Sequence, residues 1–270
     1  MRSAAELRRQ VESALAGRIP AALSFRPPVA PELLSCGLAE IDAVLGGGLP
    51  LGAITELTGA HSSGRTTLAL ATLAKITRQG ASCAYVDVSD ALDPISAAAL
   101  GVDLRRLLWV RPGEPCTRPP NTHGAAPHPG NLRREKTLWS QLDHALRATD
   151  LLLAAGGFRI IVLDLGDVPP EQARRVPLAT WYRFRLQAEK SRTLLLLLTR
   201  AACASSCAAV SLHCRQSGID WRQAALHGSR LLASLGYRVR LERSRALDLT
   251  RKKPAAAADA AWSSATSWSR

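Results

Sequence analysis

A glycine-rich run, GAHSSGRTT, occupies residues 59–67 and has the spacing of a phosphate-binding loop. In the pattern GxxxxGK[ST], backbone N–H groups of the turn and the N-terminus of the next helix together surround an anion. We therefore expect a strand before the run, a helix after it, and a nucleotide as ligand. The predicted phosphate contacts are Gly59, Ser62, Ser63, Gly64, Arg65, Thr66 and Thr67.

Two single residues define how this site should work. Arg65 stands where the pattern has lysine, and its planar guanidinium is larger than an ammonium, so we expect weakened nucleotide binding. Asp164 ends the apolar run RIIVLDL, a position typical of the Walker B carboxylate that faces magnesium. ATP with magnesium is the expected but weakly held ligand pair.

Basic residues concentrate in the last third of the chain. Residues 1–170 carry 17 Lys and Arg against 16 Asp and Glu, whereas residues 171–253 carry 17 against 5. A general preference for arginine explains why only five of the 35 basic residues are lysine, but not the local shortage of acids. The asymmetry predicts a polyanionic partner, most simply DNA. The predicted DNA contacts are Arg174, Arg175, Arg183, Arg185, Arg238, Arg240 and Arg243.

These arginines differ in how they would reach a phosphate backbone. Those at 238, 240 and 243 lie on or beside a predicted strand and should project largely to one face. Arg185 precedes Glu189 by four residues on a predicted helix, so an ion pair within the helix is the alternative for it.

The cysteines do not predict a metal centre. Cys203, Cys207, His213 and Cys214 lie close together, but no CxxC pair and no second ligand pair at finger-like spacing accompanies them. We expect free thiols. The chain also lacks a long uncharged apolar run and the apolar region of a signal peptide, so we expect a cytoplasmic protein that does not enter a membrane.

The elements that must position these residues alternate between strand and helix. Continuous apolar strands separated by helices predict an α/β fold with a mainly parallel sheet covered on both faces. The expected strands are 53–58, 82–88, 107–111, 159–165, 193–199 and 238–242, and the expected helices are 64–79, 95–100, 138–153, 180–189 and 222–235.

This core should span residues 34–250. Residues 1–33 should hold a short amphipathic helix, at 3–16, and a proline-rich linker. Residues 112–135 are rich in proline and should form a flexible insertion, and the Ala/Ser-rich residues 251–270 should form a disordered tail.

The stretch LSCGLAEIDAVLGGGLPLGAITELTGAHSSGRTTLAL, followed by CAYVDVSDALDPISAAALGVDLRRLL, resembles the RecA recombinase family. The segment around Asp87, Asp93 and Pro94 is more specific than a phosphate loop alone. Similarity continues more weakly through RIIVLDL and TLLLLLTR and covers about two thirds of the chain. The resemblance implies a RecA-type fold that binds ATP.

Departures from the family imply inefficient ATP hydrolysis. Ser89 stands where the family has the glutamate that activates water, with Asp90 beside it, and Arg200 replaces the glutamine that senses the γ-phosphate. Loss of a general base typically costs about 10²- to 10⁴-fold in rate. The segment 200–210 is short for a DNA-binding loop of a RecA filament.

The segments WYRFRLQAEKSRTLLLLLT and YRVRLERSR are similar to sequences of the ImuA group of RecA-like proteins. This resemblance implies an accessory protein of the DNA damage response and translesion synthesis. Its partners would be an ImuB-like homologue of Y-family polymerases and an error-prone replicative-type polymerase. The alternative is a DNA-dependent ATPase of homologous recombination in which Arg65 and Asp90 replace the missing groups. A cell-division inhibitor of the SOS response is disfavoured by the intact SSGRTT run and the chain length.

Overall fold

The computed structural model describes residues 32–111, 131–223, 230–244 and 259–265, together with Glu6 and Ser13, with backbone only for 131–138. The chain divides into two compact units, Met1–Ala30 and Pro31–Arg270. The helix predicted for residues 3–16 lies outside the described residues, apart from Glu6 and Ser13, which are helical.

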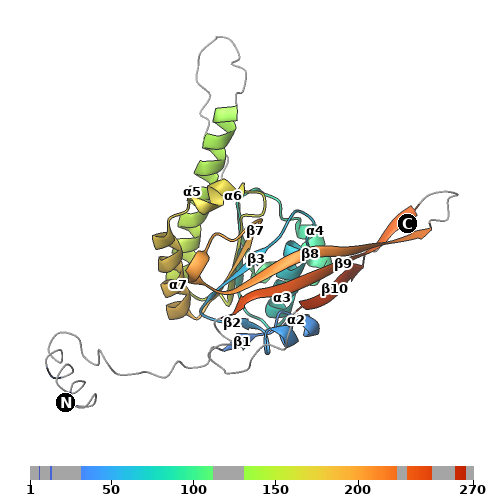
Figure 1. Cartoon of the computed structure of the whole chain (residues 1–270), viewed down its shortest axis with the longest axis horizontal. Helices are drawn as coiled ribbons and strands as arrows, with labels where there is room; N and C mark the ends of the chain where they lie inside the picture. The colour runs from blue at the N-terminus through green and yellow to red at the C-terminus, as the bar shows by residue number, and fades with distance from the viewer. Residues whose placement is uncertain are drawn as a thin grey trace, which may run out of the picture. The chain divides into compact units, whose positions relative to one another are not determined.

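The larger unit is organised around one sheet with the strand order β10-β9-β8-β3-β7-β6-β4-β5 (Figure 1). The strands from β8 to β5 run parallel, whereas β9 is antiparallel to both of its neighbours. Their bounds are β3 (Ile54–Thr58), β4 (Cys83–Asp87), β5 (Leu107–Val110), β6 (Ile160–Asp164), β7 (Leu194–Thr199), β8 (Ala208–Gln223), β9 (Arg230–Ser244) and β10 (Asp259–Ala265). A small antiparallel pair, β1 (Leu33–Leu34) and β2 (Leu49–Pro50), precedes them.

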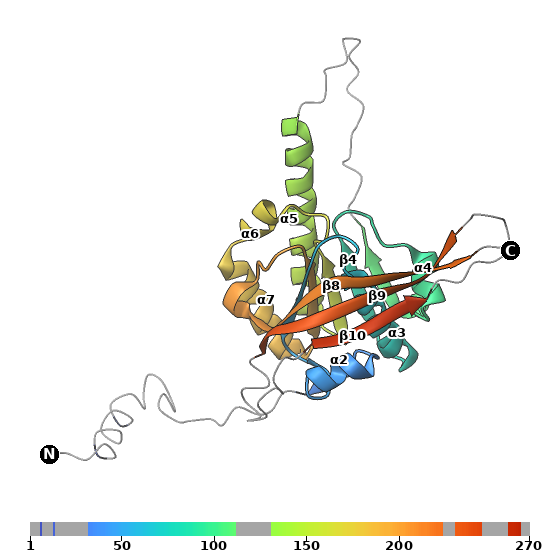
Figure 2. The same ribbon diagram turned by 45° about the vertical axis from the view of Figure 1, so that its right-hand side comes forward.

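Helices cover both faces of this sheet (Figure 2). One face carries α2 (Ala39–Val44), α3 (Arg65–Arg78) and α4 (Pro94–Ala99), and the other carries α5 (Asn131–Ala155), α6 (Pro170–Arg174) and α7 (Leu178–Ser191). Two short 3₁₀ turns, η1 (Leu104–Arg106) and η2 (Ser205–Cys207), complete the described elements. None of the helices among the described residues is long and apolar enough to cross a membrane.

The central strands explain why this architecture forms. Every residue of β3, β4 and β7 is buried, which requires apolar cover on both sides of the sheet. One core cluster lies between the sheet and α3, and a second lies between the sheet and α5 with α7. The predicted α/β fold with a mainly parallel sheet is therefore confirmed.

The helix predicted for 222–235 is wrong. Its described parts, 222–223 and 230–235, belong to β8 and β9, which pair in antiparallel register over most of their length. Leu, Ala and Arg are good helix formers, but intrinsic propensity is a weak preference, and cross-strand pairing outweighs it here. The far ends of both strands extend past α4 (Figures 1 and 2), and residues 215–223 of β8 are all exposed.

The disordered tail predicted for 251–270 is wrong for residues 259–265, which form β10. Ala260 and Trp262 are buried, while Ala261 and Ser263 are exposed, so the strand alternates as an edge strand should. Arg240 also donates a hydrogen bond from Nε to Asp259, at 3.1 Å. The remaining tail residues lie outside the described part of the chain.

The flexible insertion predicted for 112–135 extends too far at its C-terminal end. Residues 131–135 already form the first turn of α5, because the sequence NLRREK is rich in residues that favour helices. Residues 112–130 lie outside the described part of the chain.

Candidate phosphate-binding site

The loop predicted to bind phosphate connects β3 to α3, as its pattern requires. Gly64 precedes the helix with a left-handed backbone, φ 91°, and no side chain caps the first turn of α3. The N–H groups of that turn have no intrahelical partner, so they are available to an anion. Thr66 is exposed and Thr67 is partly buried at the same end of the helix.

Two buried polar atoms in this loop have no hydrogen-bond partner among the described residues. They are Ser63 Oγ and one terminal nitrogen of Arg65, and the two side chains are 3% and 7% exposed. Gly59, with φ 150°, is required here because a Cβ on it would lie 2.6 Å from Ser63 Oγ and would collide with the carbonyl oxygen of Cys214. Buried unpaired groups are costly, so the loop is arranged for a partner from outside the chain.

Arg65 extends from the start of α3 towards the end of β6. A methyl group built on Gly166 would lie 2.9 Å from Asp164 Oδ1 and 3.5 Å from both terminal nitrogens of Arg65, so carboxylate and guanidinium flank the same point. Burial lowers the pKa of Arg65, and the negative charge of Asp164 partly offsets this effect.

Asp164 is hydrogen-bonded by the protein at both carboxylate oxygens. Tyr85 Oη donates to Oδ2 at 2.5 Å, and the Gly166 N–H donates to Oδ1 at 2.7 Å. Burial raises the pKa of this carboxyl, and the Tyr85 hydrogen bond partly counters it. The expected carboxylate is thus next to the loop. However, Tyr85 and the Gly166 N–H already donate to its oxygens, and the nearby cation is the guanidinium of Arg65, an arrangement that does not fit a magnesium ligand.

Arg200 joins the loop to the turn that follows β6. Its carbonyl oxygen accepts a hydrogen bond from the Gly59 N–H, at 3.3 Å. Its guanidinium donates to the carbonyl oxygens of Gly166, at 3.1 Å, and of Asp167, at 3.5 Å. A second cation is therefore fixed beside the site, at the position expected for a neutral glutamine.

At the position where the resemblance predicts a catalytic base, the described residues provide no free carboxylate. Ser89 donates its N–H to Asp87, and Asp90 has a left-handed backbone, φ 56°. Both oxygens of Asp90 accept hydrogen bonds from Arg111, at 2.7 and 2.6 Å, and these bonds lower the pKa of Asp90. A carboxylate held in this way is a poor proton acceptor, which counts against Asp90 as a substitute base.

Two aromatic residues that the sequence analysis did not assign to the site pack directly against the loop. A Cβ on Gly64 would lie 2.6 Å from the Tyr237 ring and 3.0 Å from Trp262. The two rings lie 5.2 Å apart at a tilt of 32°. Trp262 belongs to β10, so the strand at the far edge of the sheet supports the phosphate loop.

The predicted DNA contacts separate into two groups. Arg238 and Arg240 are exposed on β9, and Arg243 is partly buried, with a hydrogen bond to the carbonyl oxygen of Ser205. The three pair with Arg215, His213 and Ser211 on β8. Residues 211, 213 and 215 alternate along β8 and therefore share a face, and cross-strand partners lie on the same face as each other. The three arginines consequently share one face, although a register shift separates Arg240 from Arg243.

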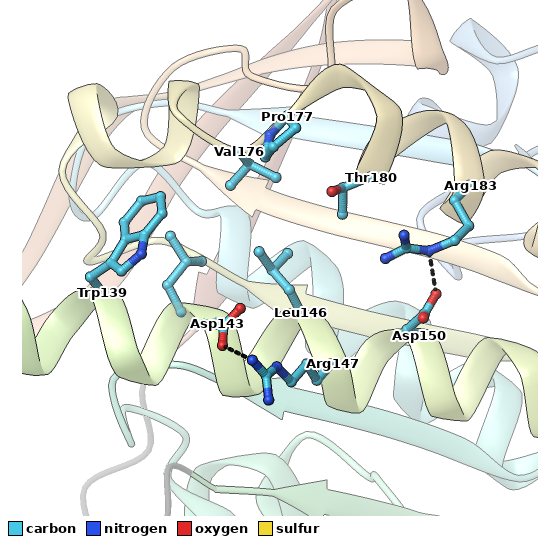
Figure 3. A pocket seen from close by; sticks show the side chains of 10 residues that line it. Trp139, Asp143, Leu146, Arg147, Asp150, Val176, Pro177, Thr180 and Arg183 are labelled. Atoms are coloured by element: carbon cyan, nitrogen blue, oxygen red, sulfur yellow. Dashed lines mark hydrogen bonds and ion pairs between the residues drawn. The ribbon is translucent and has the colours of Figure 1, made fainter.

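The other group lies on α6 and α7. Arg174 and Arg175 are exposed at the end of α6. Arg183 donates a hydrogen bond to Asp150, at 2.9 Å, beside a cavity of about 380 Å³ between α5 and α7 (Figure 3). Arg185 lies over the ring of Tyr182, at 5.3 Å. Asp150 partly neutralises the charge of Arg183, as Asp259 does that of Arg240, so Arg238 on β9 is the stronger candidate for a DNA contact.

None of the described cysteines forms a disulfide. Cys203, Cys207 and Cys214 are all buried, and burial raises the pKa of Cys214 to about 12.

The strand, phosphate loop and helix from Ile54 to Arg78 lie within a stretch that matches a known domain family. Residues 23–116 match the model of the RecA N-terminal domain family. This part of the chain is RecA-like. Domains of this family bind ATP with magnesium, which makes the departures at Arg65, Ser89 and Arg200 informative.

Curated relatives agree with this assignment. The chain is 31% identical to Protein RecA of Rhizobium rhizogenes over 184 residues, which is 63% of this chain and 44% of that protein. It is 48% identical to Protein RecA of Crocosphaera subtropica and 51% to that of Nostoc punctiforme, each over 81 residues, or 30% of this chain and 23% of theirs. The RecA-like chain spans less than half the length of the relatives it matches.

Proposed function

We propose that this RecA-like chain is an accessory protein of the DNA damage response and translesion DNA synthesis. It binds partner proteins and DNA, and it holds a nucleotide that it does not hydrolyse efficiently. The proposal takes the family from the RecA match and the accessory role from the resemblance to the ImuA group.

The observation that carries the proposal is the state of the catalytic-base position. Ser89 has no carboxylate, and the carboxylate of Asp90 is bound at both oxygens by Arg111. General-base catalysis contributes about 10²- to 10⁴-fold, so a phosphate loop without it retains a ligand far better than it cleaves one. Binding of a nucleotide without hydrolysis suits an accessory protein better than an enzyme that depends on repeated ATP hydrolysis.

DNA binding is supported by the exposed arginines on the outer strands of the sheet. Arg238 lies directly across from Arg215, so the face carries positive charge on both strands. Such a surface contacts phosphates without reading sequence, which suits a protein that acts at many damaged sites.

The partners follow from the ImuA resemblance alone. They are an ImuB-like homologue of Y-family polymerases and an error-prone replicative-type polymerase. Purified partner candidates from the same genome should co-elute with the full chain in size-exclusion chromatography, whereas a recombinase from that genome, used as a reference, should not co-elute with them.

The deciding experiment measures ATP hydrolysis by the full chain with and without single-stranded DNA. We expect turnover at least about 100-fold below that of an active RecA measured in parallel. Ser89→Glu combined with Arg111→Ala restores a free carboxylate and should raise the rate, while Arg111→Ala alone serves as the control. Robust turnover of the natural chain would overturn the proposal.

One second function has a specific observation in its favour. The loop from Gly59 to Gly64 keeps the strand, turn and helix arrangement of an ATP site, which supports a DNA-dependent ATPase of homologous recombination. DNA-stimulated hydrolysis in the same assay would favour it over the accessory role.

A further inference from the structure

The RecA-like phosphate loop has a buried cation of its own. Arg65 is 7% exposed, and one of its terminal nitrogens has no hydrogen-bond partner among the described residues. A buried guanidinium nitrogen without a partner is costly, and phosphate oxygens satisfy guanidinium groups well. The unpaired nitrogen therefore points to an anionic ligand at the N-terminus of α3.

The same guanidinium stands on the side of the site where a metal would face Asp164. Both terminal nitrogens of Arg65 and the Oδ1 atom of Asp164 lie within 3.5 Å of a Cβ position on Gly166. The carboxylate already accepts hydrogen bonds from Tyr85 and from the Gly166 N–H. A magnesium ion here would meet a carboxylate that already accepts two hydrogen bonds and a neighbouring positive charge.

A second guanidinium increases this repulsion. Arg200 is fixed by the carbonyl oxygens of Gly166 and Asp167, on the turn that also carries Asp164. Two cations beside one loop favour a polyphosphate anion and disfavour a divalent cation, because like charges in a partly buried site repel strongly.

We infer that this loop binds the free anion of a nucleoside polyphosphate, with Arg65 supplying the positive charge that magnesium supplies in other phosphate loops. The inference rests on the proposed function, since it concerns the ligand that the accessory protein retains. Asp164 acts here as a positioning residue, which holds the turn at Gly166 opposite Arg65.

The test is a titration of the full chain with a fluorescent ATP analogue in EDTA and again in excess magnesium. We expect affinity in EDTA to equal or exceed that in magnesium, with a difference of no more than about threefold. Arg65→Lys should make binding magnesium-dependent, since an ammonium group is compact and leaves room for the metal. Arg78→Lys, at the other end of α3, is the matched control and should behave as the natural chain.

A second measurement protects the test against a folding defect. Thermal unfolding of Arg65→Lys and of Arg78→Lys without nucleotide, compared with that of the natural chain, separates a change in binding from a loss of folding. Affinity of the natural chain that falls about tenfold or more on removal of magnesium would overturn the inference, as would no binding in either buffer. A loss of affinity on removal of magnesium leaves the accessory role standing, whereas no binding in either buffer would also contradict the nucleotide binding of the proposed function.

Discussion

The parallel centre of the sheet and its antiparallel extension are built on different principles. In the centre, strands such as β7 are buried along their whole length and need helices on both faces. In the extension, one side of β9 and β10 is buried through Tyr237, Val239 and Trp262, and the other side of β9 exposes arginines.

The two regions meet at the phosphate loop. Gly64 ends the loop of the centre, and the rings of Tyr237 and Trp262, from the extension, lie against it. The phosphate loop is thus shaped partly by strands that lie far from it in the sequence. Tyr237 lies on the same strand as the exposed arginines, and it packs with Trp262 on the phosphate loop. Substitutions of these two aromatic residues should therefore affect both the loop and the basic face of the sheet.

Trp262→Ala should have the largest effect. Removal of a buried aromatic side chain typically costs about 3–5 kcal/mol, and here it also exposes the support of the loop. Urea unfolding of the full chain measures the loss. Trp221→Ala, at a ring 56% exposed near the end of β8, should change stability by no more than about 0.5 kcal/mol. Equal effects of the two would mean that β10 does not pack on the loop.

Gly64→Ala should destabilise the chain by about 2–4 kcal/mol, because it adds a left-handed alanine and a collision with the Tyr237 ring. Gly157→Ala separates the two causes. Gly157 has a similar φ, 83°, but nothing lies within 4 Å of its Cβ position, so only the backbone cost of about 1 kcal/mol should remain. Thermal unfolding of both variants should rank them in this order, and a smaller loss for Gly64→Ala would count against the contact between the two regions.

Arg238→Glu with Arg240→Glu tests the exposed face of the extension. Affinity for single-stranded DNA at low salt should fall about tenfold or more, and the slope of log K against log salt should drop by about one per lost contact. Fluorescence anisotropy across a salt series measures both quantities. Arg238→Glu alone should account for most of this loss, because Arg240 is paired with Asp259, and Arg183→Glu, at an arginine paired with Asp150, should cost less than Arg238→Glu. A uniform loss for all of these variants would indicate that charge alone, and not this face, drives binding.

Much of the centre could be predicted because its signals are local. Buried strands such as Leu194–Thr199 are continuous apolar runs, and the run from Gly59 to Thr67 carries its strand–loop–helix context within one stretch of sequence. The position of Asp164 beside the loop followed from its place at the end of β6. The departures at Ser89 and Arg200 stay predictions that rest on the resemblance to the RecA family.

The extension could not be predicted because its signals are non-local. Residues 230–235 have helix-forming side chains, and only pairing with β8 makes them a strand. The alternation of Ala260 and Trp262 is short and surrounded by small residues, so it resembled a disordered tail. The contacts that hold Asp164 and Asp90, from Tyr85 and Arg111, join segments whose spacing in the sequence carries no signal.

The smallest expected effect concerns Asp164, at the centre. Burial raises the pKa of its carboxyl above the ordinary value of 3.8, so the folded state binds this proton more tightly than the unfolded state does. The resulting stability is present below the unfolded pKa and is lost as the pH rises through the folded pKa. Asp164→Asn should remove this loss, making the variant the more stable protein at neutral pH by less than about 1 kcal/mol.

Urea unfolding across a pH series checks the sign as well as the size. The natural chain should lose stability relative to Asp164→Asn as the pH rises from about 4 towards neutrality. Asp90→Asn is the matched comparison with the opposite sign, since hydrogen bonds from Arg111 lower the pKa of Asp90. That carboxylate contributes stability above its unfolded pKa, which is lost as the pH falls through the folded one, so Asp90→Asn should be the less stable protein at neutral pH. Parallel curves for all three proteins would mean that neither carboxyl is held in the environment described for it.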